Sequence, residues 1–270
     1  MILKKGLLMI SQRYFNGMHM RINKTPTPRD TIFYIHGLGE SGLCLEGIMD
    51  HPLLKGFTHL SADLPGYGKS PWPEEPLSLS RYADLLEKHL VFLNAGRVVL
   101  VGHSMGGVIG TLLCERYPER MRLFINVEGN VSVEDCTFSC IIAAHSFDEF
   151  AGSDFGRFRD EIYERGIHER ALRWYHAGLL MCDPRSIYMN SLELVNLSES
   201  EELAGRLGSL KIPVSYVWGD PGGTGEYSLG QLRAQGIPMA CVLDAGHWPF
   251  IDQPDAFAET ILDIISPVEE

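Results

Sequence analysis

A serine between two glycines lies where an apolar, β-branched run passes into helical spacing. The pattern G-x-S-x-G at residues 102–106 has Ser104 at its centre, follows the run RVVLV and precedes apolar residues three to four positions apart. In such a strand–turn–helix setting the serine sits on a sharp turn, where side chains two positions away would collide. The turn also places the serine at a helix N-terminus, whose N–H groups and dipole favour an oxyanion. We therefore predict that Ser104 is a nucleophile that attacks an acyl carbonyl group.

A nucleophilic serine requires a base that accepts its proton, and His247 has the position for this role. In hydrolases built around such a turn, the histidine comes last in chain order. His247 lies in the segment LDAGHWPFIDQP, after the last apolar run and before a helix that we expect to start near Asp252. The chain has ten histidines, and a histidine taken at random is more often a surface residue or a hydrogen-bonded core residue than a catalytic base. Position in the chain singles out His247 as the base.

Two backbone N–H groups are candidates for an oxyanion hole. The segment TIFYIHGLGESG places a glycine-rich turn, residues 36–39, directly after a predicted strand. Its glycines allow the backbone to approach a substrate closely, and we expect the N–H of Leu38 to act together with that of Met105. A plain turn between a strand and a helix is the alternative interpretation of residues 36–39.

Short apolar runs alternate with segments of helical spacing over most of the chain. This alternation predicts an α/β fold, with a mostly parallel sheet flanked by helices. Strands are expected at residues 9–14, 17–23, 31–36, 57–63, 97–102, 121–128, 212–218 and 238–243. Helices are expected at residues 41–53, 79–94, 105–117, 225–235 and 252–267. Asn16-Gly17 between the first two strands is a strong hairpin signal, so the sheet should begin with an antiparallel edge.

Residues 131–207 separate two predicted strands by far more than an ordinary connection. Ser198-x-x-Glu201 in this segment has the form of a capping box, which predicts a helix start. Apolar residues of the segment also recur at helical spacing, as at Phe155, Phe158, Ile162, Leu172, Tyr175 and Leu179. We expect a helical cap at 131–207 on an α/β core made of residues 1–130 and 208–270. The alternative is a helical subdomain that only adds stability.

Composition and charge argue against several other classes of protein. The 270-residue chain has a net charge of −12, which gives no reason to expect a nucleic acid partner. No apolar run reaches the roughly 20 residues of a membrane helix, and the N-terminal segment lacks the cleavage site of a secretory signal. The only near pair among six cysteines is Cys136 and Cys140, and metal-binding and dinucleotide-binding motifs are absent. We expect a cytoplasmic protein with free thiols, no metal and no cofactor, and the sequence does not indicate its oligomeric state.

Four segments of the chain resemble those of the α/β-hydrolase fold family. They are His36-Gly37, DLPGYGKS at residues 63–70, GHSMGG at residues 102–107 and GHWPF at residues 246–250. Their order and separations are similar to those of the family, and the resemblance covers essentially the whole chain outside the cap.

The resemblance implies both a fold and an activity. The fold is an eight-stranded sheet with a cap inserted after the sixth strand. Ser104 is then the nucleophile, His247 the base, and the N–H groups of Leu38 and Met105 the oxyanion hole. Family members with a serine mostly hydrolyse carboxylic esters, lactones or thioesters, and a smaller group cleaves carbon–carbon bonds in ring-fission products. Epoxide hydrolases and haloalkane dehalogenases of the family carry Asp as nucleophile, so Ser104 argues against both.

The third member of the triad is an acid, and here the chain departs from the family. In most of the family this acid follows the seventh strand, three residues beyond a glycine, but the residue three after Gly219 is Gly222. Asp220 is held in reserve, although it is equally compatible with a turn residue before proline. Glu128 ends the apolar sixth strand, where some family members carry their acid, and a carboxylate there needs a partner such as His247. We predict Glu128 as the acid, and a carboxylate tied to the cap hinge is the alternative.

Three functions fit these residues, and the leading one is a serine hydrolase of a small carboxylic ester, lactone or thioester. It would act through an acyl-enzyme on a small-molecule acyl substrate. A carbon–carbon bond hydrolase of ring-fission products is the first alternative, favoured by Trp248 and by cap arginines such as Arg157, Arg159 and Arg173. A non-catalytic small-molecule binding protein of the same fold is the second.

The insertion leaves the sheet at its carboxyl edge, where open α/β sheets bind ligands. We therefore expect residues 131–207 to close over the site and select the substrate. Phe155, Trp174 and Tyr175 of the cap, together with Trp248, are the expected aromatic contacts. The alternative interpretation of the cap aromatics is that they form the core of the cap itself.

Overall fold

The computed structural model describes residues 10–266, which fold around an eight-stranded sheet. The strands are β1 (Ser11–Phe15), β2 (Met18–Asn23), β3 (Thr31–Ile35), β4 (Thr58–Asp63), β5 (Val98–His103), β6 (Met121–Val127), β7 (Val214–Gly222) and β8 (Met239–Gly246). Their order in the sheet is β1-β2-β4-β3-β5-β6-β7-β8. Strands β3 to β8 pair in parallel, whereas β2 pairs antiparallel with β1 and with β4. The α/β-hydrolase sheet with an antiparallel edge is confirmed; residue 9 of the first expected strand lies outside the described residues.

The central strands are buried on both faces, which explains their continuous apolar runs. All six residues of β5 are buried, and so are all six of β4. Strands β3, β5, β6, β7 and β8 lie side by side in that order. The loops that follow their carboxyl ends therefore meet at one edge of the sheet, where open α/β sheets bind ligands.

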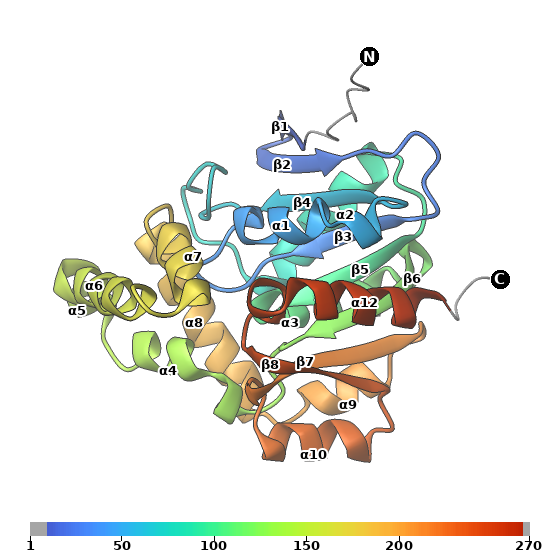
Figure 1. The fold of residues 1–270 in the computed structure, drawn as a ribbon. Coiled ribbons are helices and arrows are strands. Elements are labelled where there is room, and N and C mark those ends of the chain that lie inside the picture. Colours follow the sequence, from blue (N-terminus) through green and yellow to red (C-terminus); the bar gives the residue numbers. More distant parts are fainter. Residues whose placement is uncertain (1–9, 267–270) are drawn as a thin grey trace.

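Helices cover both faces of the sheet (Figure 1). Helices α1 (Glu46–Met49) and α12 (Pro254–Ile265) lie on one face, and α2 (Leu79–Phe92) and α3 (Met105–Arg116) lie on the other. Helix α2 packs along α3, and α12 contacts α1. None of the helices found between residues 10 and 266 combines the length and the apolar character needed to cross a bilayer.

The helix expected at residues 41–53 is broken into short pieces. The chain forms a 3-10 turn at Gly42–Leu45, then α1, then a second 3-10 turn at Pro52–Leu54. The first turn is capped by the Ser41 hydroxyl, which accepts a hydrogen bond from the N–H of Leu43 (3.4 Å). Pro52 lacks the N–H that would continue α1, so the helix ends before it.

The C-terminal helix is also interrupted. In place of one helix at residues 252–267, the chain forms α11 (Pro249–Asp252) and then α12. Gln253 between them leaves the helical region, with a φ of −132°, and each helix starts at a proline. Proline suits the first position of a helix because its missing N–H has no partner there. Residue 267 lies outside the described residues.

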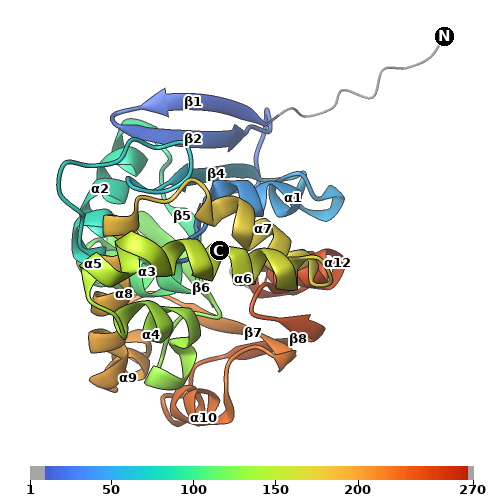
Figure 2. The ribbon, with the colours of Figure 1, turned by 90° about the vertical axis from the view of Figure 1, so that its left-hand side faces the viewer.

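The segment between β6 and β7 is helical. It contains α4 (Thr137–Ala143), α5 (Phe147–Glu149), a π-helical turn (Phe150–Asp154), α6 (Phe155–Gly166), α7 (Arg170–Leu179), α8 (Pro184–Glu199) and α9 (Leu203–Gly208). Helices α4 to α8 gather at one end of the sheet, at the left of Figure 1, and Figure 2 looks onto them. Helix α9 packs instead on α3 and on α10 (Glu226–Ala234). The division into a cap at 131–207 and a core stays a prediction, because α9 at the end of this range contacts helices that flank the sheet.

The capping box expected at Ser198 is wrong. Ser198 lies in the last turn of α8 and is fully buried, and α9 begins later, after Glu202 as its N-cap residue. Helix α8 continues past Leu194 to Glu199, and Ser198 lies on the buried face of this helix. Ser198 is therefore not at a helix start.

Strands β6 and β7 pair directly although the insertion separates them in the sequence. Phe124 lies opposite Val214, and Val127 lies opposite Val217. The register continues one residue further, because the N–H of Glu128 donates to the carbonyl of Val217 (2.9 Å). Glu128, three residues before the insertion, is thereby held at the carboxyl edge of the sheet.

Candidate active site

Ser104 lies between β5 and α3 in a conformation that residues with side chains rarely adopt. Its φ and ψ angles are 52° and −119°. Two hydrogen bonds hold the turn: the N–H of Ser104 donates to the carbonyl of Val127 (3.0 Å), and the N–H of Gly107 donates to the carbonyl of Ser104 (2.7 Å). Such a backbone costs about 1 to 3 kcal/mol and persists only where its surroundings enforce it. The predicted sharp turn is thus present at Ser104.

The glycines around Ser104 are required by close packing. A β-carbon at Gly102 would lie 2.3 Å from the carbonyl oxygen of Gly106, and one at Gly106 would lie 2.3 Å from the carbonyl oxygen of Ile35. Both contacts are with backbone atoms, so no change of rotamer relieves them. The G-x-S-x-G pattern therefore reflects how tightly α3 is packed on β3 and β5.

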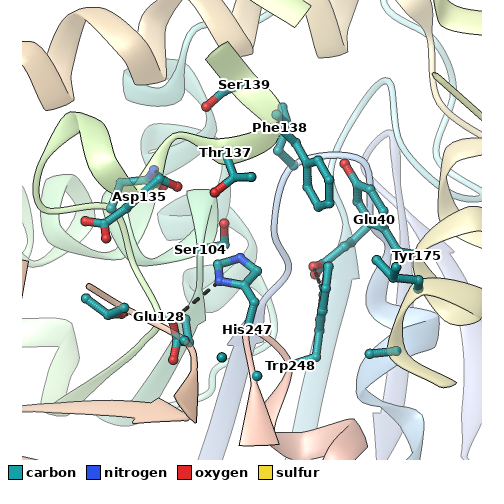
Figure 3. A pocket seen from close by; sticks show the side chains of 18 of the residues that line it. Glu40, Ser104, Glu128, Asp135, Thr137, Phe138, Ser139, Tyr175, His247 and Trp248 are labelled. Carbon is teal, nitrogen blue, oxygen red and sulfur yellow. Dashed lines mark hydrogen bonds and ion pairs between the residues drawn. The ribbon is translucent and has the colours of Figure 1, made fainter. Parts of the chain in front are cut away.

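Ser104, His247 and Glu128 line one cavity (Figure 3). His247 directly follows β8, and Glu128 directly follows β6. The Nδ1 atom of His247 lies 3.4 Å from Oε2 of Glu128. The Glu128 side chain is 1% exposed and that of His247 is 28% exposed. The structure brings together the three residues that the sequence selected, with the carboxylate buried and the imidazole reachable from solvent.

The Glu128 carboxylate is oriented by β7 and by the loop that follows it. Its Oε1 atom accepts a hydrogen bond from the N–H of Gly219 (2.6 Å), and its Oε2 atom accepts one from the hydroxyl of Thr224 (2.8 Å). A β-carbon at Gly223 would lie 2.0 Å from Oε1, so a glycine there leaves the space that the carboxylate fills. A buried charge needs such partners. Strand β7 and the loop after it each supply one hydrogen bond to the carboxylate that follows β6.

Asp220 is placed outside the cavity. It is exposed, lies within β7 opposite Leu243 of β8, and is absent from the residues that line the cavity. Strand β7 continues to residue 222, beyond the expected end at residue 218, so Asp220 belongs to the strand and not to a loop that could turn it inward. The reserve assignment of Asp220 therefore has no geometric support.

The two expected oxyanion donors come from the loop after β3 and from the start of α3. Leu38 lines the cavity and is buried. Met105 is the first residue of α3, so its N–H has no carbonyl partner within the helix. Gly39 next to Leu38 has a φ of 75°, which glycine adopts without strain. Leu38 of this turn thus lines the same cavity as Ser104, and the oxyanion role of the Leu38 and Met105 N–H groups stays a prediction.

A second buried carboxylate, that of Glu40, also lines the cavity. The indole Nε1–H of Trp248 donates to its Oε1 atom (2.6 Å), and the N–H of Gly37 donates to its Oε2 atom (2.7 Å). The Nδ1 atom of His103 lies 3.0 Å from Oε1. Burial by itself raises the pKa of the Glu40 carboxyl, but the His103 charge and these hydrogen bonds lower it to about 2. Burial lowers the pKa of His103, but the Glu40 charge together with the hydrogen bonds to Glu40 and to the carbonyl of His247 outweighs burial and raises it.

The cavity has a volume of about 470 Å³ and one aromatic wall. The rings of Phe138 and Tyr175 stack with their centroids 5.0 Å apart, and the ring of Trp248 lies 5.4 Å from that of Tyr175. Figure 3 shows this wall on the side of the cavity where Glu40 lies. Two of the four aromatic contacts expected from the sequence, Tyr175 and Trp248, therefore line the cavity.

Phe155 and Trp174, the other two expected contacts, do not line the cavity. Phe155 is 5% exposed and packs against Phe150 with ring centroids 5.1 Å apart, so it belongs to the core of the insertion. Trp174 is 39% exposed on α7. Neighbouring residues of a helix point in directions about 100° apart, so Tyr175 faces the cavity while Trp174 faces solvent.

Several cavity residues were not expected from the sequence: Glu40, Phe138 and Thr224, with His103 behind them. Glu40 carried a usable signal, since it stands three residues after Gly37 in a glycine-rich turn, where a carboxylate can accept a backbone N–H. Thr224 and Phe138 carried none, because their positions depend on how the loop after β7 and helix α4 pack.

The arrangement has the parts of an acyl-transfer site. It combines a hydroxyl at a helix start, an imidazole, a buried carboxylate behind the imidazole, and backbone N–H groups on a glycine-rich turn. Within residues 10–266, no group of three or more His, Cys, Asp or Glu side chains is placed to hold a metal ion.

Curated relatives of the chain include an esterase. Pimeloyl-[acyl-carrier protein] methyl ester esterase of Neisseria meningitidis is 24% identical over 260 residues, which cover 88% of this chain and 94% of that protein. Uncharacterised proteins of Mycobacterium bovis and Mycobacterium tuberculosis are 32% identical over 102 residues, but the match spans only 30% of their length.

Solved structures share the fold. An esterase from Thermogutta terrifontis superposes with a TM-score of 0.76 at 20% identity, over 97% of this chain and 98% of that one. The enol-lactonase of Burkholderia xenovorans superposes with a TM-score of 0.74 at 19% identity, over 95% and 100%. Residues 32–260 match the alpha/beta hydrolase family as a whole. This chain therefore belongs to the alpha/beta hydrolase family, and the hydrolase expected from its sequence is confirmed at that level.

Proposed function

We propose that the protein is a serine hydrolase of a small carboxylic ester, lactone or thioester. His247 takes the proton of the Ser104 hydroxyl while Oγ attacks the substrate carbonyl. The N–H groups of Leu38 and Met105 bind the oxyanion, and the intermediate collapses with transfer of the proton from His247 to the leaving group. A water molecule, deprotonated by His247, then attacks the acyl-enzyme, and the carboxylic acid leaves as Ser104 regains its proton.

One observation carries this proposal: Ser104, His247 and Glu128 line the same cavity, with the Glu128 carboxylate 3.4 Å from Nδ1 of His247. A carboxylate at Nδ1 favours the tautomer with the proton on that nitrogen, which leaves Nε2 free to accept the serine proton. The esterase and lactonase activities named for similar proteins agree with this chemistry.

Carbon–carbon hydrolysis stays the second candidate because it uses the same three residues. The cap arginines that favoured it give it little support. Arg157 pairs with Asp154 and is 71% exposed, and the guanidinium of Arg173 donates to the carbonyls of Gly166 and Ile167. None of the arginines at 157, 159 and 173 is among the cavity residues.

The proposal is tested by covalent labelling of the serine. A fluorophosphonate should label the protein once per chain at Ser104, because only an activated hydroxyl in an oxyanion hole reacts with it. Peptide mass mapping locates the adduct, and Ser139→Ala serves as a matched control, since Ser139 lines the same cavity. Wild-type protein that stays unlabelled would favour the binding-protein alternative. A panel of nitrophenyl esters beside a coloured ring-fission dienone then separates the two hydrolases.

The helical insertion is proposed to act as the cap that selects the substrate, and its test is Tyr175→Phe. The Tyr175 hydroxyl is buried in the structure and has no hydrogen-bond partner among residues 10–266. A substrate oxygen in the cavity would satisfy it, and one such bond is worth about 0.5 to 1.5 kcal/mol. We expect Tyr175→Phe to raise KM by about 2- to 10-fold with kcat nearly unchanged, as measured by steady-state hydrolysis of the best ester.

The control for this variant is Tyr163→Phe, because Tyr163 is 55% exposed on α6 and lies outside the cavity. It should leave both constants at the wild-type value. Equal KM values for Tyr175→Phe and the wild type would show that the hydroxyl does not contact the substrate. We also propose a cytoplasmic location, because all six cysteines are free thiols.

A further inference from the structure

His103 occupies the variable position before Ser104, and both of its ring nitrogens face acceptors. Its Nδ1 atom lies 3.0 Å from Oε1 of Glu40, and its Nε2 atom lies 2.7 Å from the carbonyl oxygen of His247. A neutral imidazole has one N–H and one lone pair, so it satisfies only one of two acceptors. Both contacts are made at once only by the doubly protonated, positively charged ring.

Glu40 presents the complementary case, because every neighbour of its carboxylate is a donor. Oε1 accepts from the indole N–H of Trp248, and Oε2 accepts from the N–H of Gly37. The Cys44 thiol lies 3.5 Å from Oε2 and 3.1 Å from the carbonyl of Ser41, and His103 approaches both carboxylate oxygens at 3.0 and 3.1 Å. An amide in this place would turn an NH₂ group toward one of these donors. The site is therefore built for two oxygens carrying a negative charge.

These contacts link three loops of the proposed active site. Gly37 belongs to the turn that carries the oxyanion donor, His103 is the last residue of β5 before Ser104, and Trp248 follows His247. The side chains of Glu40 and His103 are 2% and 1% exposed. Water does not screen an ion pair at this depth, so the geometry of the three loops depends on the two charges.

We propose that Glu40 and His103 form a permanent buried ion pair that positions the His247 loop against the nucleophile turn and the oxyanion turn. The inference rests on the proposed function for its effect on rate, but the pair itself can be observed without any substrate. Both residues act through the backbone of their neighbours and are positioning residues. The titratable groups that face the pair are Cys44, His36, Glu128, Tyr175, Cys182 and His247.

The charge of His103 is measured by nitrogen-15 NMR of the imidazole rings. A free imidazole is mostly neutral at about pH 8, since its pKa is about 6.5. We expect His103 in the wild-type protein to carry protons on both nitrogens at about pH 8, with its signals identified from the assigned backbone. In Glu40→Gln the ring should carry one proton at the same pH, because burial then acts without the opposing carboxylate. One proton on His103 of the wild type at this pH would overturn the proposal, whether or not the variant folds.

The expected effect on catalysis is a lower kcat with a nearly unchanged KM. Glu40→Gln should lower kcat of ester hydrolysis by about 10- to 100-fold, the loss expected for small misplacements of catalytic groups, with KM changed less than about threefold. Asp255→Asn is the matched control, because Asp255 pairs with Nε2 of His51 (2.8 Å) on the exposed surface of α12. A wild-type kcat in Glu40→Gln would overturn the positioning role. Absence of ester turnover in every protein, with His103 still doubly protonated, would count against the proposed function and not against the pair.

Discussion

Ser104→Ala is expected to abolish hydrolysis while leaving the fold intact. The acyl-enzyme requires the hydroxyl, and removal of a nucleophile of this kind lowers kcat by at least about 10⁴-fold. The fold should tolerate the change because alanine has the same backbone preferences as serine at the positive φ of this turn and is smaller. The measurements are burst and steady-state kinetics with the best ester, and thermal unfolding of the same sample.

The matched control for this experiment is Ser139→Ala, which removes a hydroxyl from the same cavity away from the turn. It should keep kcat within a few-fold of the wild type. Hydrolysis by pure Ser104→Ala at a rate within a few-fold of the wild type would remove Ser104 from the mechanism. A lower unfolding temperature accompanied by lost activity would instead mean that the turn had collapsed.

Glu128→Gln is expected to lower kcat by about 10³- to 10⁴-fold with little change in KM. The Gly219 N–H faces Oε1 and requires an acceptor there, so the new NH₂ group takes the place of Oε2 beside Nδ1 of His247. That NH₂ donates to Nδ1, which moves the imidazole proton to Nε2, where it prevents proton transfer from Ser104. A comparable change of an acid to its amide in serine proteases lowers kcat by about 10⁴-fold through the wrong tautomer.

The paired variant is Asp220→Asn, which makes the same chemical change on an exposed residue outside the cavity. Its kcat and KM should both stay within about twofold of the wild type, as for most surface substitutions. Full kinetic analysis of both variants against one ester gives the comparison. A severe loss in Asp220→Asn together with a mild loss in Glu128→Gln would assign the acid to β7.

The sheet and the nucleophile turn could be predicted because their sequence signals are also packing requirements. The glycines at 102 and 106 have no room for a β-carbon, and the six residues of β5 are buried, so pattern and structure have one cause. The place of Glu128 beside His247 could be predicted for a similar reason, since a carboxylate that ends an apolar strand must find a partner.

Features that depend on packing between distant segments could not be predicted. Trp174 and Tyr175 are adjacent aromatic residues, and the sequence does not show which of them faces the cavity. The packing of α7 on the rest of the protein places Tyr175 there. The split of the expected C-terminal helix depends on the φ of Gln253. His103 stands at a variable position of G-x-S-x-G and carries no sequence signal of its contact with Glu40, which is 63 residues away in the chain.

The direct pairing of β6 with β7 has a consequence for how such a chain can diverge. The proposed oxyanion turn, nucleophile and acid all come from residues before 131, whereas His247 follows the insertion in the chain. The register of β6 on β7 and that of β7 on β8 must be preserved for the two parts to meet. A change in the length or sequence of the insertion therefore leaves the reacting groups in place, and under the proposed cap role it would alter substrate preference before it alters the chemistry.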